Sequence, residues 1–148
     1  MITIDSRERK FGHIKSYFNR NNVPYEVKKL DFGDYAIETA PQLVIDRKRN
    51  LEEVATNLCS ADSSRFGREI RGAHRLGIKV IILVEHGDPI KSVRDVSAWK
   101  NPYSAYMSGD RIVEQMMKTS LAYGVEWRFC NKRDTGRKIL EILGYGKR

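Results

Sequence analysis

The stretch Lys79–Glu85 constrains the fold more than any other part of the sequence. Its central residues, Val-Ile-Ile-Leu-Val, are all apolar and mostly β-branched, which is typical of strands. A short run that is apolar at every position indicates a strand buried on both faces, since a strand with one wet face would alternate with polar residues. We therefore expect this strand at the centre of the core, in a sheet covered by helices.

The rest of the hydrophobic pattern alternates between strands and helices. Strands are expected at 2–5, 25–30, 35–38, 43–45 and 125–129, and helices at 11–21, 50–58, 65–76 and 108–124, with a last helix capped by Asp134. The second, third and fourth strands follow one another through short turns and are expected to pair as a meander. This order predicts an α/β domain whose mixed central sheet is flanked by helices.

Composition limits the domain organisation and the class of partner. A chain of 148 residues, 41% of them hydrophobic, is long enough for one domain with a substantial core and too short for two. The net charge of +8 favours a polyanionic partner such as nucleic acid. No stretch reaches the roughly 18 apolar residues of a membrane span. The start is not typical of a signal peptide, and we expect a soluble protein of the cytoplasm.

A predicted hairpin brings two carboxylates and a lysine together. Asp34 lies where the first of two neighbouring strands begins, and Asp46 and Lys48 lie where the second ends. Side chains alternate along a strand, so Lys48 faces the same side as Asp46. Arg47 faces the other side and offers this site only its backbone carbonyl.

These side chains suit metal-dependent hydrolysis of a phosphodiester. Mg²⁺ prefers oxygen ligands and usually takes one or two carboxylates from the protein, keeping water for the rest of its shell. Such an ion polarises a phosphoryl oxygen, generates a nucleophile from water and stabilises the leaving oxygen. Asp34 and Asp46 form the expected pair of ligands, and Lys48 can orient the attacking water or offset charge on the phosphate. These three residues are the predicted catalytic residues.

The motifs also resemble those of a known family. Gly33-Asp34-Tyr35, followed by Asp46-Arg47-Lys48 and by Glu52, is similar to the Gly-Asp and Glu-Arg-Lys-x-x-x-Asp pattern of the nuclease domain of the XPF family of structure-specific endonucleases. Further matching segments are Asp5-Ser6-Arg7-Glu8, Ser64-Arg65-Phe66 and 81–85. The resemblance implies a restriction-endonuclease-like fold with a PD-(D/E)xK core and a nuclease that depends on Mg²⁺ or Mn²⁺.

The resemblance implies roles for individual residues. The metal would be held by Asp34, Asp46, the Arg47 carbonyl and Glu52, DNA would be bound by Arg7 and Arg65, and support would come from Asp5 and Glu8. The family's Glu is replaced by Asp46 and its last Asp by Glu52, so both carboxylates remain at a changed length. Glu52 has a second interpretation, because an acid in the first turn of a helix is also favoured by the helix dipole.

The resemblance also implies a domain organisation. We expect one XPF-type nuclease domain over 1–148, with its motifs in about 1–85 and a helix-strand-helix unit at 108–143 completing it. We expect neither the helix-hairpin-helix module that family members commonly append nor a preceding helicase domain. The sequence therefore resembles a minimal, stand-alone nuclease of the kind found in phages or bacteria.

Three surface features have alternative interpretations. Lys100 lies in the aromatic stretch 99–106, which either stacks on unpaired bases and binds nucleic acid or is a loop pinned to the core. Arg68, Arg71 and Arg75 form either a phosphate-binding face or a solvated helical stripe. The apolar residues at the predicted C-terminal helices are either core or a homodimer face, namely Met116, Met117 and Leu121.

The function expected from all this is a metal-dependent DNA endonuclease that acts on branched or otherwise structured DNA in repair, recombination or replication. One alternative is a non-catalytic DNA-binding subunit of the same fold. Another is a four-way-junction resolvase, which shares the chemistry and differs in its substrate.

Overall fold

A six-stranded mixed sheet forms the centre of the computed structural model, which describes residues 1–59, 63–87, 89–102 and 107–146. The strands lie in the order β2-β1-β3-β4-β5-β6. Their bounds are β1 Ile2–Ile4, β2 Tyr25–Val27, β3 Tyr35–Ile37, β4 Ala40–Lys48, β5 Lys79–Glu85 and β6 Glu126–Cys130. β1 pairs with β2, β4 with β5 and β5 with β6 in parallel, whereas β3 is antiparallel to both β1 and β4.

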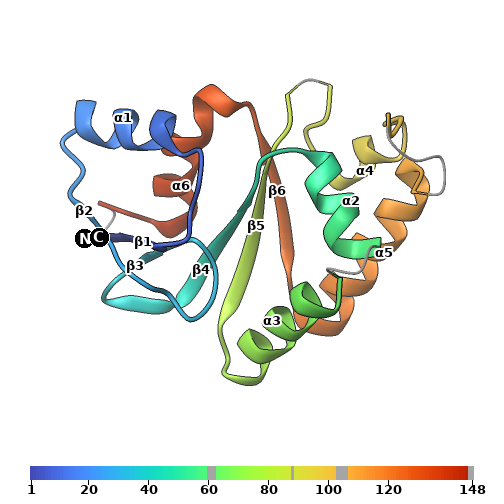
Figure 1. Cartoon of the computed structure of the whole chain (residues 1–148), viewed down its shortest axis with the longest axis horizontal. Helices are drawn as coiled ribbons and strands as arrows, with labels where there is room; N and C mark the ends of the chain where they lie inside the picture. The colour runs from blue at the N-terminus through green and yellow to red at the C-terminus, as the bar shows by residue number, and fades with distance from the viewer. Residues whose placement is uncertain (60–62, 88, 103–106, 147–148) are drawn as a thin grey trace.

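Helices cover both faces of the sheet (Figure 1). One face carries α1 Gly12–Arg20 and α6 Thr135–Leu143, and the other carries α2 Leu51–Cys59, α3 Ser63–Arg75 and α5 Gly109–Tyr123. The short helix α4 Val93–Val96 packs on α5, and the 3-10 turn η1 Lys132–Asp134 leads into α6. Each face has its own hydrophobic cluster. The predicted α/β class with a mixed, helix-flanked sheet is confirmed.

β5 contributes side chains to both clusters. Ile82 and Val84 belong to the cluster under α2, α3 and α5, and Leu83 belongs to the cluster under α1 and α6. All three side chains are fully buried, and β5 has a neighbouring strand on each edge. The predicted burial of this strand on both faces is therefore confirmed.

β4 shows the same alternation in its apolar half. Val44 belongs to the cluster under α2 and α3, and Ile45 belongs to the cluster under α1 and α6. Because side chains alternate along a strand, Asp46 follows Val44 to the first face and Arg47 follows Ile45 to the second. The parallel register places Arg47 beside Leu83 of β5. One strand thus delivers neighbouring charged residues to opposite faces of the sheet.

The predicted meander of the second, third and fourth strands is wrong, because β1 lies between β2 and β3. The chain passes from β1 through α1 to the parallel strand β2, and such a connection needs a crossover. The segment that follows β2 then passes over β1, donating the Leu30 amide to the Asp5 carboxylate at 2.9 Å. β2 accordingly ends at Val27, before the predicted end at Leu30.

Helix caps follow the expected residues with one exception. The Asn50 side chain accepts a hydrogen bond from the Glu53 amide at 2.8 Å, as an N-cap does. α5 ends at Gly124, whose φ of 68° is the left-handed conformation of a C-terminal glycine. Asp134 occupies the N-cap position of α6 without a side-chain capping bond. Its carboxylate lies 3.7 Å from the Arg137 guanidinium instead.

The structure separates the three apolar residues of α5. Met116 is fully buried in the core, whereas the Met117 side chain is 51% exposed and that of Leu121 85%. In the stretch 99–106, Trp99 packs against the core, and residues 103–106 lie outside the described part of the chain. None of the described helices is both long and apolar enough to cross a membrane.

The contact between α1 and α6 leads to a first prediction. A Cβ added at Gly136 would lie 2.7 Å from Cδ1 and 2.8 Å from Cβ of Tyr17, so we expect Gly136→Ala to lower the free energy of unfolding by about 1–3 kcal/mol. Gly12→Ala is the matched control, since nothing lies within 4 Å of its added Cβ. Urea titration measures both. Equal stability of the two variants would contradict the close packing.

Candidate active site

A glycine turn fixes the first carboxylate against β4. Gly33 has a φ of +74°, and a Cβ there would lie 2.9 Å from the Val44 Cβ, so only glycine fits without strain. The Asp34 amide then donates to the Ile45 carbonyl at 2.7 Å. The Arg47 amide donates to Oδ2 of Asp34 at 2.8 Å. The strand backbone therefore orients the Asp34 carboxylate directly.

Asp46 and Lys48 lie on the same face of β4, as strand alternation predicts. Nζ of Lys48 is 3.4 Å from Oδ1 of Asp46, and both residues are buried. The Lys48 ammonium also lies 5.0 Å from the centroid of the Phe66 ring. Burial works against the pKa of Lys48, but the charges of Asp46, Glu53 and Asp34 outweigh it and raise that pKa. Lys48 is therefore a cation at neutral pH and a poor general base.

The two carboxylates repel each other across the site. Burial, then the charge of Asp46, then that of Glu8 raise the pKa of Asp34 well above its usual value. The described residues contain no group of three His, Cys, Asp or Glu side chains placed to hold a metal. A pair is what Mg²⁺ commonly takes from a protein, with water completing the shell. Asp34 and Asp46 thus fit a hydrated divalent cation, whose charge would offset their repulsion.

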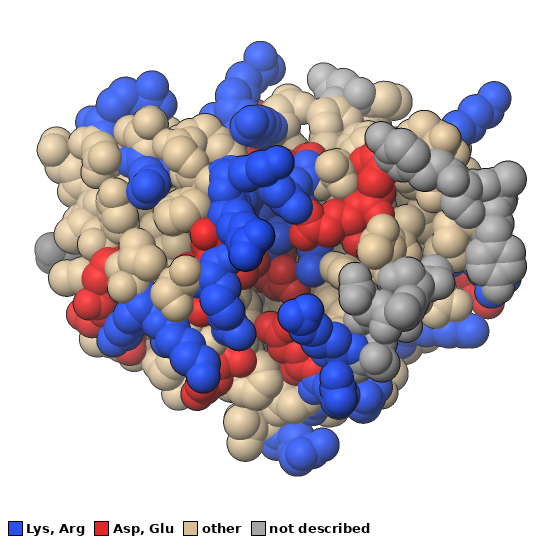
Figure 2. Space-filling view, viewed as in Figure 1, with Lys and Arg blue, Asp and Glu red and all other residues tan. Residues whose placement is uncertain are grey.

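Two cavities meet at Asp34 and Lys48, and Asp46 lines the smaller of them. The larger has a volume of about 530 Å³ and the smaller about 260 Å³. Four residues line both cavities, namely Arg7, Asp34, Lys48 and Glu69. On this face, Lys and Arg side chains surround acidic ones (Figure 2). The larger cavity adds Arg65 and Arg68 of α3, and the smaller adds Arg9 and Arg49. The acidic centre therefore has a rim that attracts phosphate.

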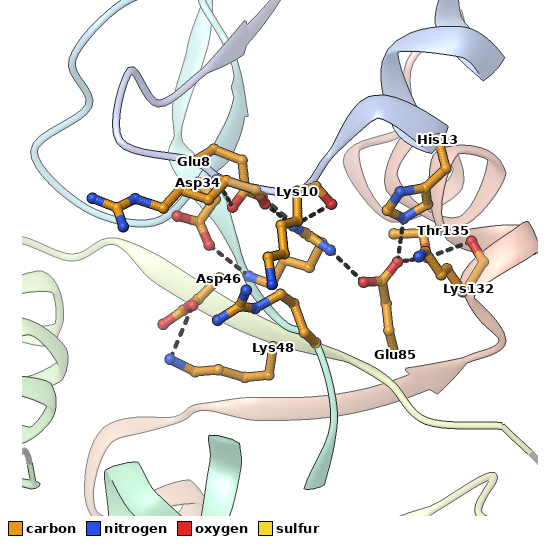
Figure 3. A network of polar contacts seen from close by, with 12 residues as sticks. Glu8, Lys10, His13, Asp34, Asp46, Lys48, Glu85, Lys132 and Thr135 are labelled. Atoms are coloured by element: carbon orange, nitrogen blue, oxygen red, sulfur yellow. Dashed lines mark hydrogen bonds and ion pairs between the residues drawn. The ribbon is translucent and has the colours of Figure 1, made fainter. Parts of the chain in front are cut away.

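The Arg47 side chain lies on the opposite face, in a buried polar network. Its Nε donates to Glu8 at 2.8 Å, its Nη1 to Glu85, and its Nη2 to the Arg9 carbonyl at 2.6 Å. Glu85 also contacts Nε2 of His13 at 2.6 Å and accepts a hydrogen bond from the Thr135 hydroxyl. Figure 3 shows Glu85, His13 and Thr135 grouped apart from Asp46 and Lys48.

This network is a structural element that the sequence reasoning missed in part. Burial opposes the charge of Arg47, but hydrogen bonding to Glu8 and the charges of Glu8 and Glu85 raise its pKa. Glu8 was expected to support the site, and it both pairs with Arg47 and lines the smaller cavity. Glu85, His13 and Thr135 were not predicted. An acid that ends an otherwise apolar, buried strand was the available signal for Glu85.

Asp5 and Arg7 lie together at the larger cavity. Nε of Arg7 donates to Oδ2 of Asp5 at 3.0 Å, and Nη2 donates to the Leu30 carbonyl at 3.0 Å. The hydrogen bond with Asp5 is the main cause that raises the pKa of Arg7. Asp5 is buried, whereas Arg7 is exposed. Asp5 therefore orients an arginine that remains open to a ligand.

Glu52 and Lys100 lie away from this centre. Glu52 is in the first turn of α2, near His86. Burial lowers the pKa of His86, and the charge of Glu52 opposes this more weakly. Glu53, the next residue, lines the smaller cavity and pairs with Arg49 at 3.2 Å. Because Leu51 begins the helix and is fully buried, the helical phase directs Glu53 rather than Glu52 to the cavity. Lys100 lines a separate cavity between α4 and α5.

Glu69 of α3 is a further acidic residue of the site that the sequence did not predict. It lines both cavities and accepts a hydrogen bond from the Gly33 amide at 3.2 Å. Burial and then the charge of Asp46 raise its pKa. The signal was its helical spacing, since Glu69 lies four residues after Arg65 and shares its face of the helix.

The buried network leads to a second prediction. Arg47→Met leaves Glu8 and Glu85 buried without their cation, so we expect the free energy of unfolding to fall by about 3–5 kcal/mol. Arg128→Met is the control, because Arg128 pairs with Glu126 at 2.7 Å and their side chains are 52% and 40% exposed, and an exposed pair contributes about 1 kcal/mol or less. Both are measured by urea denaturation. A loss as small as the control's would show that Arg47 is not a structural centre.

Solved structures of other proteins resemble this chain in fold. In solved structures, XPF from Aeropyrum pernix matches with a TM-score of 0.71 at 20% identity, covering 96% of this chain and 62% of that one. The same protein in a complex with DNA matches with a TM-score of 0.67 at 19% identity, covering 97% and 62%. The chain thus spans less than two thirds of the solved XPF chains.

A comparison with curated protein sequences gave no significant match. The family model of the ERCC4 domain, in contrast, matches residues 4–142. That range contains the Gly33-Asp34 turn, the Asp46-Arg47-Lys48 strand end and Glu69. The restriction-endonuclease-like fold expected from the motifs is the fold of the solved XPF domain. The chain therefore belongs to the ERCC4-domain family, the XPF-type nuclease family that its motifs resemble.

Proposed function

We propose that this protein is a divalent-metal-dependent endonuclease that hydrolyses phosphodiester bonds in DNA. The observation that carries the proposal is the pair Asp34 and Asp46 in a cavity that also holds the Lys48 ammonium and is surrounded by arginines. A carboxylate pair alone would attract only a cation. The arginine rim adds attraction for a phosphate chain, so that the two together suit a metal ion acting on nucleic acid.

Each residue has a role that its geometry supports. Asp34 and Asp46 would hold Mg²⁺ or Mn²⁺, which when bound supplies a Lewis acid and an activated water. The Arg47 amide holds the Asp34 carboxylate in place. Lys48, kept protonated by the surrounding acids, would orient the attacking water or offset charge that builds on the phosphoryl oxygens. The Arg47 carbonyl and Glu52 remain proposed ligands, and Glu53 is better placed than Glu52 to face the cavity.

DNA is the proposed substrate because of the surface and the relatives. Arg65 and Arg68 are exposed on α3 at the edge of the larger cavity, and Arg7 is held open by Asp5. The solved XPF from Aeropyrum pernix has been captured in a complex with DNA. Branched DNA, met in repair, recombination or replication, is the substrate class we favour within this proposal. Lys100 would contact only those parts of a DNA substrate that extend beyond the two cavities.

Two other functions differ in what they require. A non-catalytic DNA-binding subunit would not need the two carboxylates and Lys48 side by side in a cavity, so their presence favours the enzyme. A four-way-junction resolvase would need two active sites, and the exposed Met117 and Leu121 on α5 offer an apolar face for a second copy. Paired, symmetric nicks confined to four-way junctions would select the resolvase.

The catalytic proposal gives a third prediction. Asp46→Asn should reduce cutting of a panel of linear, flap, fork and four-way DNA by more than about 100-fold with Mg²⁺ or Mn²⁺, since loss of a metal ligand costs at least as much as loss of its supporting residues. DNA binding and thermal stability should be retained. Glu114→Gln is the control, because Glu114 is exposed on α5, where it pairs with Lys118 at 3.4 Å. Failure of the wild-type protein to cut any of these DNAs would refute the proposed function.

The arginine rim gives a fourth prediction. Replacing both Arg65 and Arg68 by alanine should weaken binding to all DNA sequences alike, because phosphate contacts carry no sequence information. The slope of log Kd against log salt should fall by about 2, or about 1 for each lost contact. Fluorescence anisotropy over a salt series measures this. Arg128→Ala, on β6, should leave the slope unchanged. An equal fall of the slope in this control would show that the effect comes from the net charge of the protein and not from contacts of Arg65 and Arg68 with phosphate.

A further inference from the structure

We propose that Glu69 is a positioning residue for the cleavage reaction, which joins the Asp34 turn to the arginine-bearing helix α3. The inference rests on the proposed function. Its structural basis is the hydrogen bond from the Gly33 amide to Oε1 of Glu69 at 3.2 Å. Gly33 directly precedes the proposed metal ligand Asp34, so Glu69 acts on the metal site through the backbone.

The turn contacts α3 at a second point, which makes the joint specific. A Cβ added at Gly72 would lie 3.1 Å from Cε1 of Phe32, so the Phe32 ring packs closely over the helix at that glycine. Glu69 and Gly72 are three residues apart and therefore lie on the same face of α3. Phe32 and Gly33 are neighbours in the turn. An apolar contact and a polar contact, side by side, thus dock the turn on one face of the helix.

The contact between the turn and α3 connects the proposed metal ligand to the arginines that would bind the substrate. α3 carries Arg65 and Arg68 at the larger cavity, and the turn carries Asp34 between the two cavities. A phosphate chain held by the arginines would be cut correctly only if its distance from Asp34 is fixed. The Glu69 hydrogen bond, together with the Phe32 contact, would fix that distance, because it ties the turn before β3 to α3.

The Glu69 carboxylate could act through its charge instead of through its hydrogen bond, and the two roles predict different effects of substitution. Glu69 interacts electrostatically with Asp46, Lys48 and Arg7. If the charge were what matters, Glu69→Gln would be as damaging as Glu69→Ala. If the acceptor for the Gly33 amide matters, Glu69→Gln keeps a carbonyl oxygen at the same position and rescues the site. The pair of variants separates the two roles.

The test compares Glu69→Ala and Glu69→Gln with the wild type in three measurements. Hydrogen exchange at the Gly33 amide should be faster in Glu69→Ala and near wild type in Glu69→Gln. Affinity for Mn²⁺, measured without DNA, should fall about 10–100-fold in Glu69→Ala, as for other residues that orient metal ligands, and recover in Glu69→Gln. For cleavage, kcat should fall by a similar factor with KM for DNA little changed, since the arginines remain.

The outcomes decide the inference separately from the proposed function. Glu114→Ala and Glu114→Gln, on the exposed face of α5, serve as matched controls. Equal losses in Glu69→Ala and Glu69→Gln, or unchanged Gly33 exchange in Glu69→Ala, would overturn the positioning role even if the wild type cuts DNA. If the wild type cuts no DNA, the proposed nuclease fails, while Gly33 exchange and Mn²⁺ binding still decide whether Glu69 holds the turn.

Discussion

The buried contact of the Arg47 guanidinium with Glu8 and Glu85 is the interaction on which the arrangement of this domain depends. Three charged groups taken out of water are tolerated only if each is paired and hydrogen-bonded. The guanidinium meets that requirement with its fork of donors, two carboxylates and a backbone carbonyl. Glu85 extends the network to His13 of α1 and Thr135 of α6. The network therefore joins two strands, two helices and the loop after β1.

Each face of β4 carries two acids around one cation, but the two groups differ in how closed they are. The Arg47 guanidinium is buried and hydrogen-bonded to both of its acids. The Lys48 ammonium pairs with Asp46 at 3.4 Å, and burial, then the charge of Asp46, then that of Glu8 raise the pKa of Asp34. Because Asp34 and Asp46 line a cavity, a dissociable cation can reach them, and its charge would offset their repulsion.

Sequence reasoning was most successful where the information is local. Strand parity separated Arg47 from Asp46 and Lys48, and the apolar run of β5 identified a strand that is buried on both faces. It was less successful where distant segments meet, since Glu85 and Arg47 are 38 residues apart and nothing near either one predicts the contact. The order of β1 was missed because strand pairing depends on a crossover and not on adjacency in the chain. The sequence did not predict that Glu53 lines the smaller cavity, because the side that an acid of α2 faces depends on how the helix packs. Glu52 as a metal ligand stays a prediction.

The burial of the Arg47 side chain changes how the Asp-Arg-Lys motif should be interpreted in mutagenesis. Three consecutive residues of one motif divide between two kinds of role, with Asp46 and Lys48 at the cavity and Arg47 in the core. A variant of Arg47 that no longer cuts DNA would therefore report lost folding as readily as lost chemistry. Variants of its two neighbours report on chemistry more directly, because their side chains end in a cavity and not in a closed network.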